Sequence, residues 1–112
     1  MVIEIKEYDE SEYAYREIKE NPIILDFSTC RYYLDIYKLL KEKFGLPIAC
    51  GSNWSAIWDM LRDRFYDEEY FEVHIYGYYS MPEKWQESCK KMLEIFDDVH
   101  QETPNVVFKL IN

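Results

Sequence analysis

Apolar and polar positions follow two different periods along this chain, and the two periods predict a mixture of strands and helices. The short apolar run IILDF, at 23–27, follows Asn21-Pro22 and precedes polar residues, which is typical of a buried strand. The segments YFEVHIY at 70–76 and VVFKLI at 106–111 share its β-branched and aromatic character. We expect a strand in each of these three segments.

Apolar residues recur at steps of three and four in the segments between these strands, which predicts amphipathic helices. The first helix is expected over 31–44, with Ser28 or Thr29 as its N-cap and Gly45 as its C-terminal stop. A connecting loop, GLPIACGS at 45–52, separates it from a second helix. The second helix therefore begins close to the middle of the chain.

A third, longer helix is predicted after the tyrosine-rich turn at 77–81. Pro82 is suited to start it, and one apolar stripe with charged residues between runs from Glu83 to about Glu102. The breaking sequence Thr-Pro-Asn at 103–105 then precedes the last strand.

The order strand, helix, helix, strand, helix, strand predicts an α/β fold with a small parallel sheet flanked by helices, because parallel strands need helical crossovers. We expect a single domain with a core at 22–112 and an N-terminal extension at 1–21. In the extension, Ile3 and Ile5 alternate with charged residues like an edge strand, and 11–20 is compatible with a short helical turn.

Composition agrees with one compact, acidic domain. The chain has 112 residues, of which 48% are hydrophobic and 18% aromatic, and this content is too high for a disordered segment. Its 22 acidic residues exceed the 13 Lys and Arg, giving a formal charge of −9 that repels phosphate backbones and attracts basic partners. Direct binding to nucleic acid is not expected, although the acidity is also explained by solubility alone.

The cysteines and the chain start indicate a reduced compartment. Cys30, Cys50 and Cys89 are odd in number and form no CxxC pair, so we expect buried thiols rather than disulfides or a zinc site. Charges within the first residues exclude the apolar stretch of a signal peptide, and no apolar run reaches the roughly 20 residues that span a bilayer. We expect a cytoplasmic protein without membrane contact, cofactor or metal, monomeric when free.

The second helix combines a core-facing stripe with an exposed acid. Its apolar residues fall at helical spacing: Trp54, Ile57, Trp58, Leu61 and Phe65. Ser52 or Asn53 can cap its N-terminus, and Trp54 is expected in the core. Trp58 lies at the edge of the stripe beside a polar stripe that contains Ser55, Asp59 and Arg62, so Asp59 is expected to point outward next to an indole. Spacing alone does not distinguish a functional carboxylate from a solvated one.

The amino-acid sequence of this segment resembles that of the barstar family of intracellular inhibitors of barnase-type ribonucleases. The shared pattern is LP-xxx-GxNxxAxWDxL, and it is carried here by Leu46-Pro47, Gly51, Asn53, Ala56, Trp58, Asp59 and Leu61. The predicted order of elements over 23–112 is also similar to the three-stranded parallel sheet and flanking helices of that family.

The resemblance implies an inhibitor whose second helix and preceding loop plug the active site of a basic ribonuclease, of the extracellular type or a ribonuclease toxin. Asp59 would occupy a substrate-phosphate position, because a carboxylate accepts the same charge-assisted hydrogen bonds from Arg and Lys. Trp58 would shield Asp59, and Gly51 with Asn53 would form the contact where the loop meets the helix.

Two positions depart from the family pattern. Ala49 stands where barstar has a loop tyrosine, and Ser55, kept here among the contact residues, stands where it has a second helix aspartate. It therefore stays open whether barnase itself is bound.

Acidic residues also gather in the last two turns of the third helix, where the helix dipole disfavours negative charge. Asp98 and Glu102 are four residues apart and share a face. The resemblance gives both a secondary, electrostatic role in the nuclease contact, whereas a merely solvated acidic end is the alternative. Metal binding by Asp98, His100 and Glu102 is a weak further alternative, because alternate helix positions point apart.

Two other function classes stay open at this point. One is a protein-binding module of the same fold whose partner is not a nuclease. The other is a small enzyme that uses His74 or the tyrosines at 76–79, although no recognisable nucleophile pair, phosphate loop or metalloprotease motif is present in the sequence.

Overall fold

A computed structural model of the chain describes residues 12–65 and 69–111. Its elements, in chain order, are β1 (Ile23–Asp26), α1 (Leu34–Lys43), α2 (Trp54–Arg62), β2 (Phe71–Tyr76), α3 (Glu83–Glu102) and β3 (Val106–Leu110). Short 3₁₀ helices at Phe27–Thr29 and Tyr78–Ser80 follow β1 and β2. The predicted order of strands and helices is confirmed.

The three strands form one parallel sheet with β2 in the middle. Leu25 of β1 lies opposite Ile75 of β2, and Val73 of β2 lies opposite Phe108 of β3. This is the α/β fold that the alternation of strands and helices predicts.

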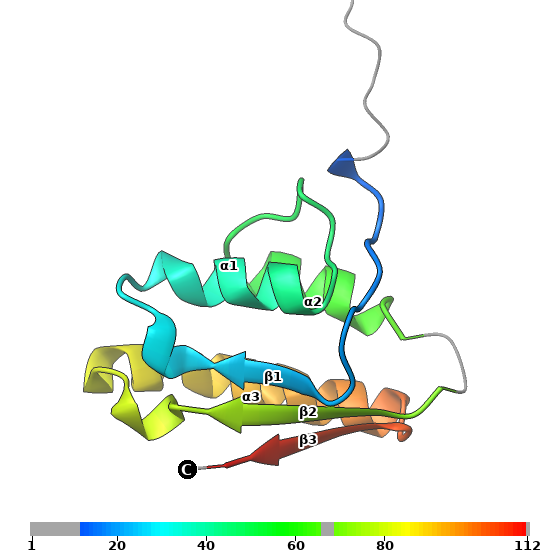
Figure 1. The fold of residues 1–112 in the computed structure, drawn as a ribbon. Coiled ribbons are helices and arrows are strands. Elements are labelled where there is room, and N and C mark those ends of the chain that lie inside the picture. The colour runs from blue at the N-terminus through cyan, green and yellow to red at the C-terminus, as the bar shows by residue number, and fades with distance from the viewer. Residues whose placement is uncertain (1–11, 66–68, 112) are drawn as a thin grey trace, which may run out of the picture.

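The helices leave one face of this sheet uncovered. In Figure 1, α3 runs behind the sheet and α1 lies above β1, while the face toward the viewer carries no helix of the described residues. Side chains of β2 divide accordingly: Val73 and Ile75 are buried toward the helices, whereas Glu72 and His74 are only half-buried. The sheet is thus apolar on one face and polar on the other.

The core is formed by the apolar stripes of the three helices, and aromatic rings connect its parts. The stripes bury Ile36, Leu40, Ile57, Leu61, Cys89, Met92, Phe96 and Val99. Phe44, directly after α1, meets Phe65 and Phe96 edge-on, with ring centroids 6.1 and 5.9 Å apart. Phe96 stacks on Phe108 of β3 at 4.5 Å. These contacts fix the helices against the sheet.

The predicted cap of the first helix is wrong. Ser28 and Thr29 lie in the 3₁₀ helix after β1, where Asp26 Oδ1 accepts from the Ser28 N–H at 3.0 Å. The helix begins only at Leu34, and Tyr33, its N-cap residue, makes no side-chain capping bond. The local bonds to Asp26 hold this turn in place, so the helix starts three residues later than its periodicity suggests.

Two burial predictions need correction. Cys30 is half-exposed rather than buried, whereas Cys50 and Cys89 are buried as expected. Trp54 is also only half-buried, although it packs against the core. The three thiols are free cysteines.

The N-terminal extension is described from residue 12 onward, so the expected edge strand at Ile3 and Ile5 lies outside the described residues. Within 11–20, where a short helical turn is expected, the chain turns at 12–14, and 15–20 contain neither helix nor strand. This segment passes the loop between α1 and α2 before it enters β1 (Figure 1). No helix among the described residues has the length and apolar composition required to cross a bilayer.

Candidate functional site

The start of α2 is fixed by its N-cap, Asn53. The residue has an extended backbone, and its side-chain oxygen accepts the Ala56 N–H at 2.8 Å. A Cβ added at Gly51 would lie 3.0 Å from Asn53 Nδ2 and 3.3 Å from Ala56 Cβ, so the loop lies tightly against the first helical turn. Gly51 and Asn53 therefore lie together where the loop meets the helix.

The loop before α2 is tied to α1 by Lys41. Its ammonium group donates to the Cys50 carbonyl and to the Ser52 hydroxyl, both at 3.2 Å. Burial raises the pKa of the Cys50 thiol, the Lys41 charge lowers that pKa, and the Asp59 charge raises it. The pKa of Cys50 is therefore influenced both by the Lys41 cation of α1 and by the Asp59 carboxylate of α2.

Asp59 points outward from α2, as its spacing predicts. Its side chain is exposed, and it makes no hydrogen bond or ion pair with any residue that the structure describes. Ile57 and Leu61 on the opposite side of the helix are completely buried. The carboxylate is therefore presented on a helix whose other face is anchored in the core.

Trp58 and Ser55 flank Asp59 on the same helix. Trp58 is half-buried, and the Arg62 guanidinium lies over its ring at 5.5 Å from the centroid. Ser55 is exposed. The indole next to the carboxylate thus already carries the Arg62 guanidinium on its face.

Trp54 positions α2 instead of facing a partner. Its indole N–H donates to the Ser88 hydroxyl at 3.2 Å, and its ring meets Tyr37 edge-on at 4.7 Å. These contacts join α2 to α3 and α1, which agrees with the structural role predicted for Trp54.

The acidic end of α3 contains acids of two kinds. Glu94 pairs with Lys91 at 3.4 Å, and Asp97 accepts from the Gln101 amide at 2.9 Å. Asp98 and Glu102 are exposed and, within the described part of the chain, have neither a hydrogen bond nor an ion pair. The two acids selected from the sequence are thus the ones without an internal partner.

The structure does not connect these two acids directly to Asp59. Helices α2 and α3 pack against each other, but no hydrogen bond or ion pair among the described residues joins Asp98 or Glu102 to Gly51, Asn53, Ser55, Trp58 or Asp59. They are a second group of acids on a neighbouring helix. Nor do 12–65 and 69–111 contain a cluster of three potential metal ligands.

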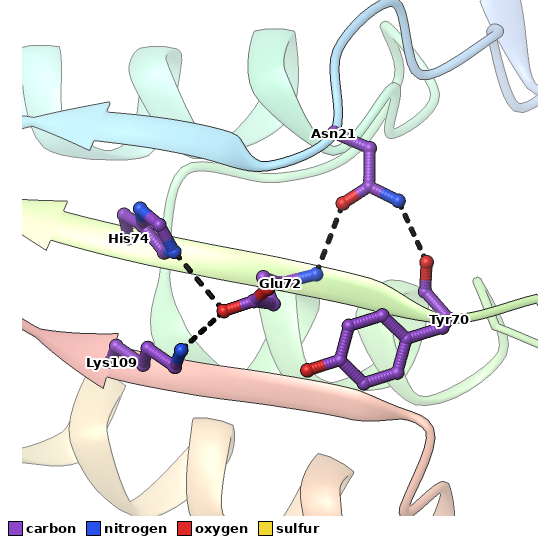
Figure 2. Close-up of polar contacts among 5 residues, drawn as sticks. All are labelled: Asn21, Tyr70, Glu72, His74 and Lys109. Atoms are coloured by element: carbon purple, nitrogen blue, oxygen red, sulfur yellow. Dashed lines mark hydrogen bonds and ion pairs between the residues drawn. The ribbon is translucent and has the colours of Figure 1, made fainter.

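The two histidines make structural contacts. Figure 2 shows His74 and Lys109 on either side of Glu72, with His74 Nε2 3.3 Å and Lys109 Nζ 2.5 Å from the same carboxylate oxygen. The bonds from Lys109 and then His74 hold the pKa of Glu72 below its usual range. His100 Nδ1 lies 2.7 Å from the Val106 carbonyl, at the connection between α3 and β3. The His74 contact lies within β2, where Glu72 also pairs with Lys109 of β3, and the His100 contact joins α3 to β3.

The tyrosine-rich turn is part of the packing. Tyr78 is buried, its hydroxyl donates to the Gln86 carbonyl at 2.9 Å, and burial raises the pKa of Tyr78. Its ring meets Tyr79 edge-on at 5.2 Å. The turn therefore anchors the start of α3.

The family model described as barstar, the barnase inhibitor, matches residues 21–111. The chain belongs to the barstar family. The matched range contains every described helix and strand and every candidate residue of this barstar-family protein, whereas 12–20 lie outside it. Neither the comparison with curated proteins nor that with solved structures gave a match. The family is one of inhibitors, not of enzymes, which agrees with the structural roles of His74 and Tyr78 in this member.

Sequence patterns did not indicate which residues fix the loop and the two helices beside it in this barstar-family protein. Lys41 donates to loop oxygens, Arg64 donates to the Phe44 carbonyl at 2.8 Å, and the Tyr15 hydroxyl donates to the Met60 carbonyl at 2.6 Å. Most of the acceptors are backbone carbonyls, and these have no signature in the sequence. The sequence feature that did point to this region is Gly45, which was expected to end the first helix. In the structure its backbone is left-handed (φ 62°) at the point where the loop leaves α1.

Proposed function

We propose that this protein inhibits a basic ribonuclease of the barnase type by inserting Asp59 into its active site in place of a substrate phosphate. The observation that carries the proposal is an exposed carboxylate, without a partner in 12–65 or 69–111, on a helix that is anchored in the core. Gly51, Asn53, Ser55 and Trp58 form the surface around it.

The chemistry follows from what a ribonuclease must provide. A cleft that holds a phosphodiester is lined with cationic donors, and these form short, charge-assisted hydrogen bonds with a carboxylate as well as with a phosphate. A carboxylate on a helix that is anchored in the core loses little backbone entropy when it binds. Asp98 and Glu102 add negative potential from α3 and strengthen the attraction.

The net charge supports the same pairing. A molecule of charge −9 is attracted to a basic nuclease over a long range, which increases the rate of encounter. An inhibitor of this kind acts in the cytoplasm, where a ribonuclease toxin or a misdirected secreted ribonuclease would otherwise cleave the cell's own RNA.

The test is an RNA-cleavage assay with a panel of purified barnase-type ribonucleases. We expect the wild-type protein to inhibit at least one of them, and Asp59→Asn to weaken that inhibition by roughly 30-fold or more, the effect of removing a hot spot worth about 2 kcal/mol. Asp98→Ala and Glu102→Ala should each have smaller effects.

Asp63→Asn is the matched control, because Asp63 is an exposed aspartate at the end of the same helix and the substitution changes the charge equally. It should leave inhibition nearly unchanged. Equal inhibition by wild type and Asp59→Asn would contradict the proposed mechanism. If no nuclease of the panel is inhibited, affinity capture followed by mass spectrometry would identify the partner of a module with another function.

A further inference from the structure

The segment Glu12–Arg16, which we call the strap, lies outside the family match but is bonded to the candidate binding loop. The Glu12 carbonyl accepts the Ala49 N–H at 2.8 Å, and the Arg16 N–H donates to the Gly45 carbonyl at 2.8 Å. From Glu12 to Arg16 the residue number in the strap rises by four, while that of the bonded loop residue falls by four, from Ala49 to Gly45. The strap therefore runs antiparallel to the loop along its length.

Side chains reinforce this attachment. The Tyr15 hydroxyl donates to the carbonyl of Met60, the residue after Asp59, at 2.6 Å. The Arg16 guanidinium donates to the Leu46 carbonyl at 3.1 Å, and Arg64, just beyond α2, donates to the Arg16 carbonyl at 3.0 Å. The strap thus contacts both parts of the proposed site, the loop and the central helix.

The backbone at Gly45 is adapted to the strap. With φ at 62°, this residue brings its Cα close to the strap, and an added Cβ would lie 2.2 Å from the Arg16 carbonyl oxygen. Only glycine allows so close an approach in this conformation.

The joined strap and loop expose large apolar side chains. Ile48 is 60% exposed, Tyr13 is 52% exposed and Tyr15 is 37% exposed. Loop residues 45–52 contain no aromatic side chain of their own, so the strap supplies the aromatic surface here. Tyrosine beside aliphatic side chains is typical of protein interfaces, and a tyrosine ring also attracts the Arg and Lys side chains of a basic partner.

We propose that the strap is part of the partner-binding face: it fixes the loop, and Tyr13 together with Ile48 contacts the same basic ribonuclease that receives Asp59. This inference rests on the proposed function. The apolar contact excludes water from the rim of the interface, and a charge pair at its centre is stronger in a drier environment.

The experiment uses a barnase-type ribonuclease that the wild-type full chain inhibits. Tyr13→Ala and Ile48→Ala should each raise the inhibition constant by about tenfold, the effect of losing one well-packed interface side chain. Tyr32→Ala is the matched control, because Tyr32 is a tyrosine that is 72% exposed and lies outside the strap and the loop. It should leave the inhibition constant unchanged. Urea unfolding of each variant would show whether an effect comes from lost contact or from lost folding.

The outcomes separate this inference from the proposed function. If Tyr13→Ala and Ile48→Ala inhibit as well as the wild type while Asp59→Asn does not, the inference is overturned and the proposed function stands. A wild-type protein that inhibits no nuclease of the panel overturns both. Amide hydrogen exchange gives a further check on the free protein: the Arg16 and Ala49 amides should be protected, and rapid exchange at both would overturn the attachment of strap to loop.

Discussion

Several single side chains in this protein form hydrogen bonds with backbone N–H and carbonyl groups. Asn53 caps α2, and Asp35 accepts the backbone N–H groups of Arg31 and Tyr32. Arg64 donates to the carbonyls of Phe44 and Arg16. An unpaired backbone group in a buried or half-buried position costs free energy, so these contacts stabilise a helix start and chain segments without regular structure. The candidate carboxylates, in contrast, have no such task.

Asn53→Ala tests the cap of the central helix. We expect the free energy of unfolding to fall by about 1 kcal/mol, because the Ala56 N–H loses its acceptor. Urea denaturation followed by tryptophan fluorescence measures the change. Asn53→Asp keeps a side-chain oxygen at the cap and should stay within a few tenths of a kcal/mol of the wild type. A similar loss in both variants would indicate that the amide nitrogen matters more than the cap.

The cysteines offer a prediction about reactivity. Burial raises the pKa of Cys89 to about 12, so at pH 8 almost none of it is the reactive thiolate. We expect iodoacetamide to modify Cys30, which is half-exposed, well before Cys89 in the folded protein. Peptide mass spectrometry over a time course would resolve the two sites, and both should react rapidly in urea. Equal rates in the folded state would contradict the burial of Cys89.

At the scale of elements, the binding loop depends on contacts from several directions. Lys41 holds its end, the strap runs along it, and Asn53 and Gly51 join it to α2. A loop of this composition would lose substantial entropy on binding if it were free, and ordering it in advance reduces that loss.

Gly45→Ala is the substitution that tests this support. The new Cβ would combine a strained positive φ with a contact at 2.2 Å to the Arg16 carbonyl oxygen, so we expect a loss of roughly 2 kcal/mol or more in unfolding free energy. The Arg16 and Ala49 amides should also exchange faster. Gly51→Ala is the comparison, since Gly51 has no positive φ, and its effect on stability should be smaller. Unchanged stability of Gly45→Ala would show that the strap can move aside without cost.

At the scale of the whole molecule, charge determines how a partner is approached. The formal net charge is −9, and the proposed site itself carries Asp59 and, on α3, Asp98 and Glu102. Long-range attraction of this kind acts mainly on the association rate and is screened by salt.

We therefore expect the association rate constant with an inhibited ribonuclease to fall by about tenfold or more between roughly 0.05 and 0.5 M NaCl, because the Debye length shortens. The dissociation rate should change much less. Stopped-flow tryptophan fluorescence measures both. Asp59→Asn removes one charge of many, so this variant should keep most of the salt dependence while it dissociates faster. An association rate that does not depend on salt would argue against electrostatic steering.

The sequence predicted some features of the site well for identifiable reasons. Asp59 is at the position where helical spacing turns a side chain away from Ile57 and Leu61, so its exposure followed from the period of the helix. The cap at Asn53 followed from residue type. The start of α1 was misplaced because Ser28 has a nearer competitor, the Asp26 carboxylate, and no periodicity reveals such a local bond. The partner contacts of all the candidate residues, Asn53 included, are predictions.

Local periodicity and residue chemistry thus determined by themselves the strands, the helices with their apolar stripes and the outward direction of Asp59, since these depend on interactions within a few residues. The parallel sheet followed from the order of these elements, because helical crossovers between strands favour parallel pairing. Only the tertiary structure decided that no described helix covers one face of the sheet, that Asp98 and Glu102 have no partner among the described residues, and that the strap is bonded to the loop. The attachment of the strap joins Arg16 to Gly45, 29 positions apart, through backbone atoms that every residue possesses. A contact between atoms common to all residues leaves no mark in the sequence, and it becomes visible only when the chain is folded.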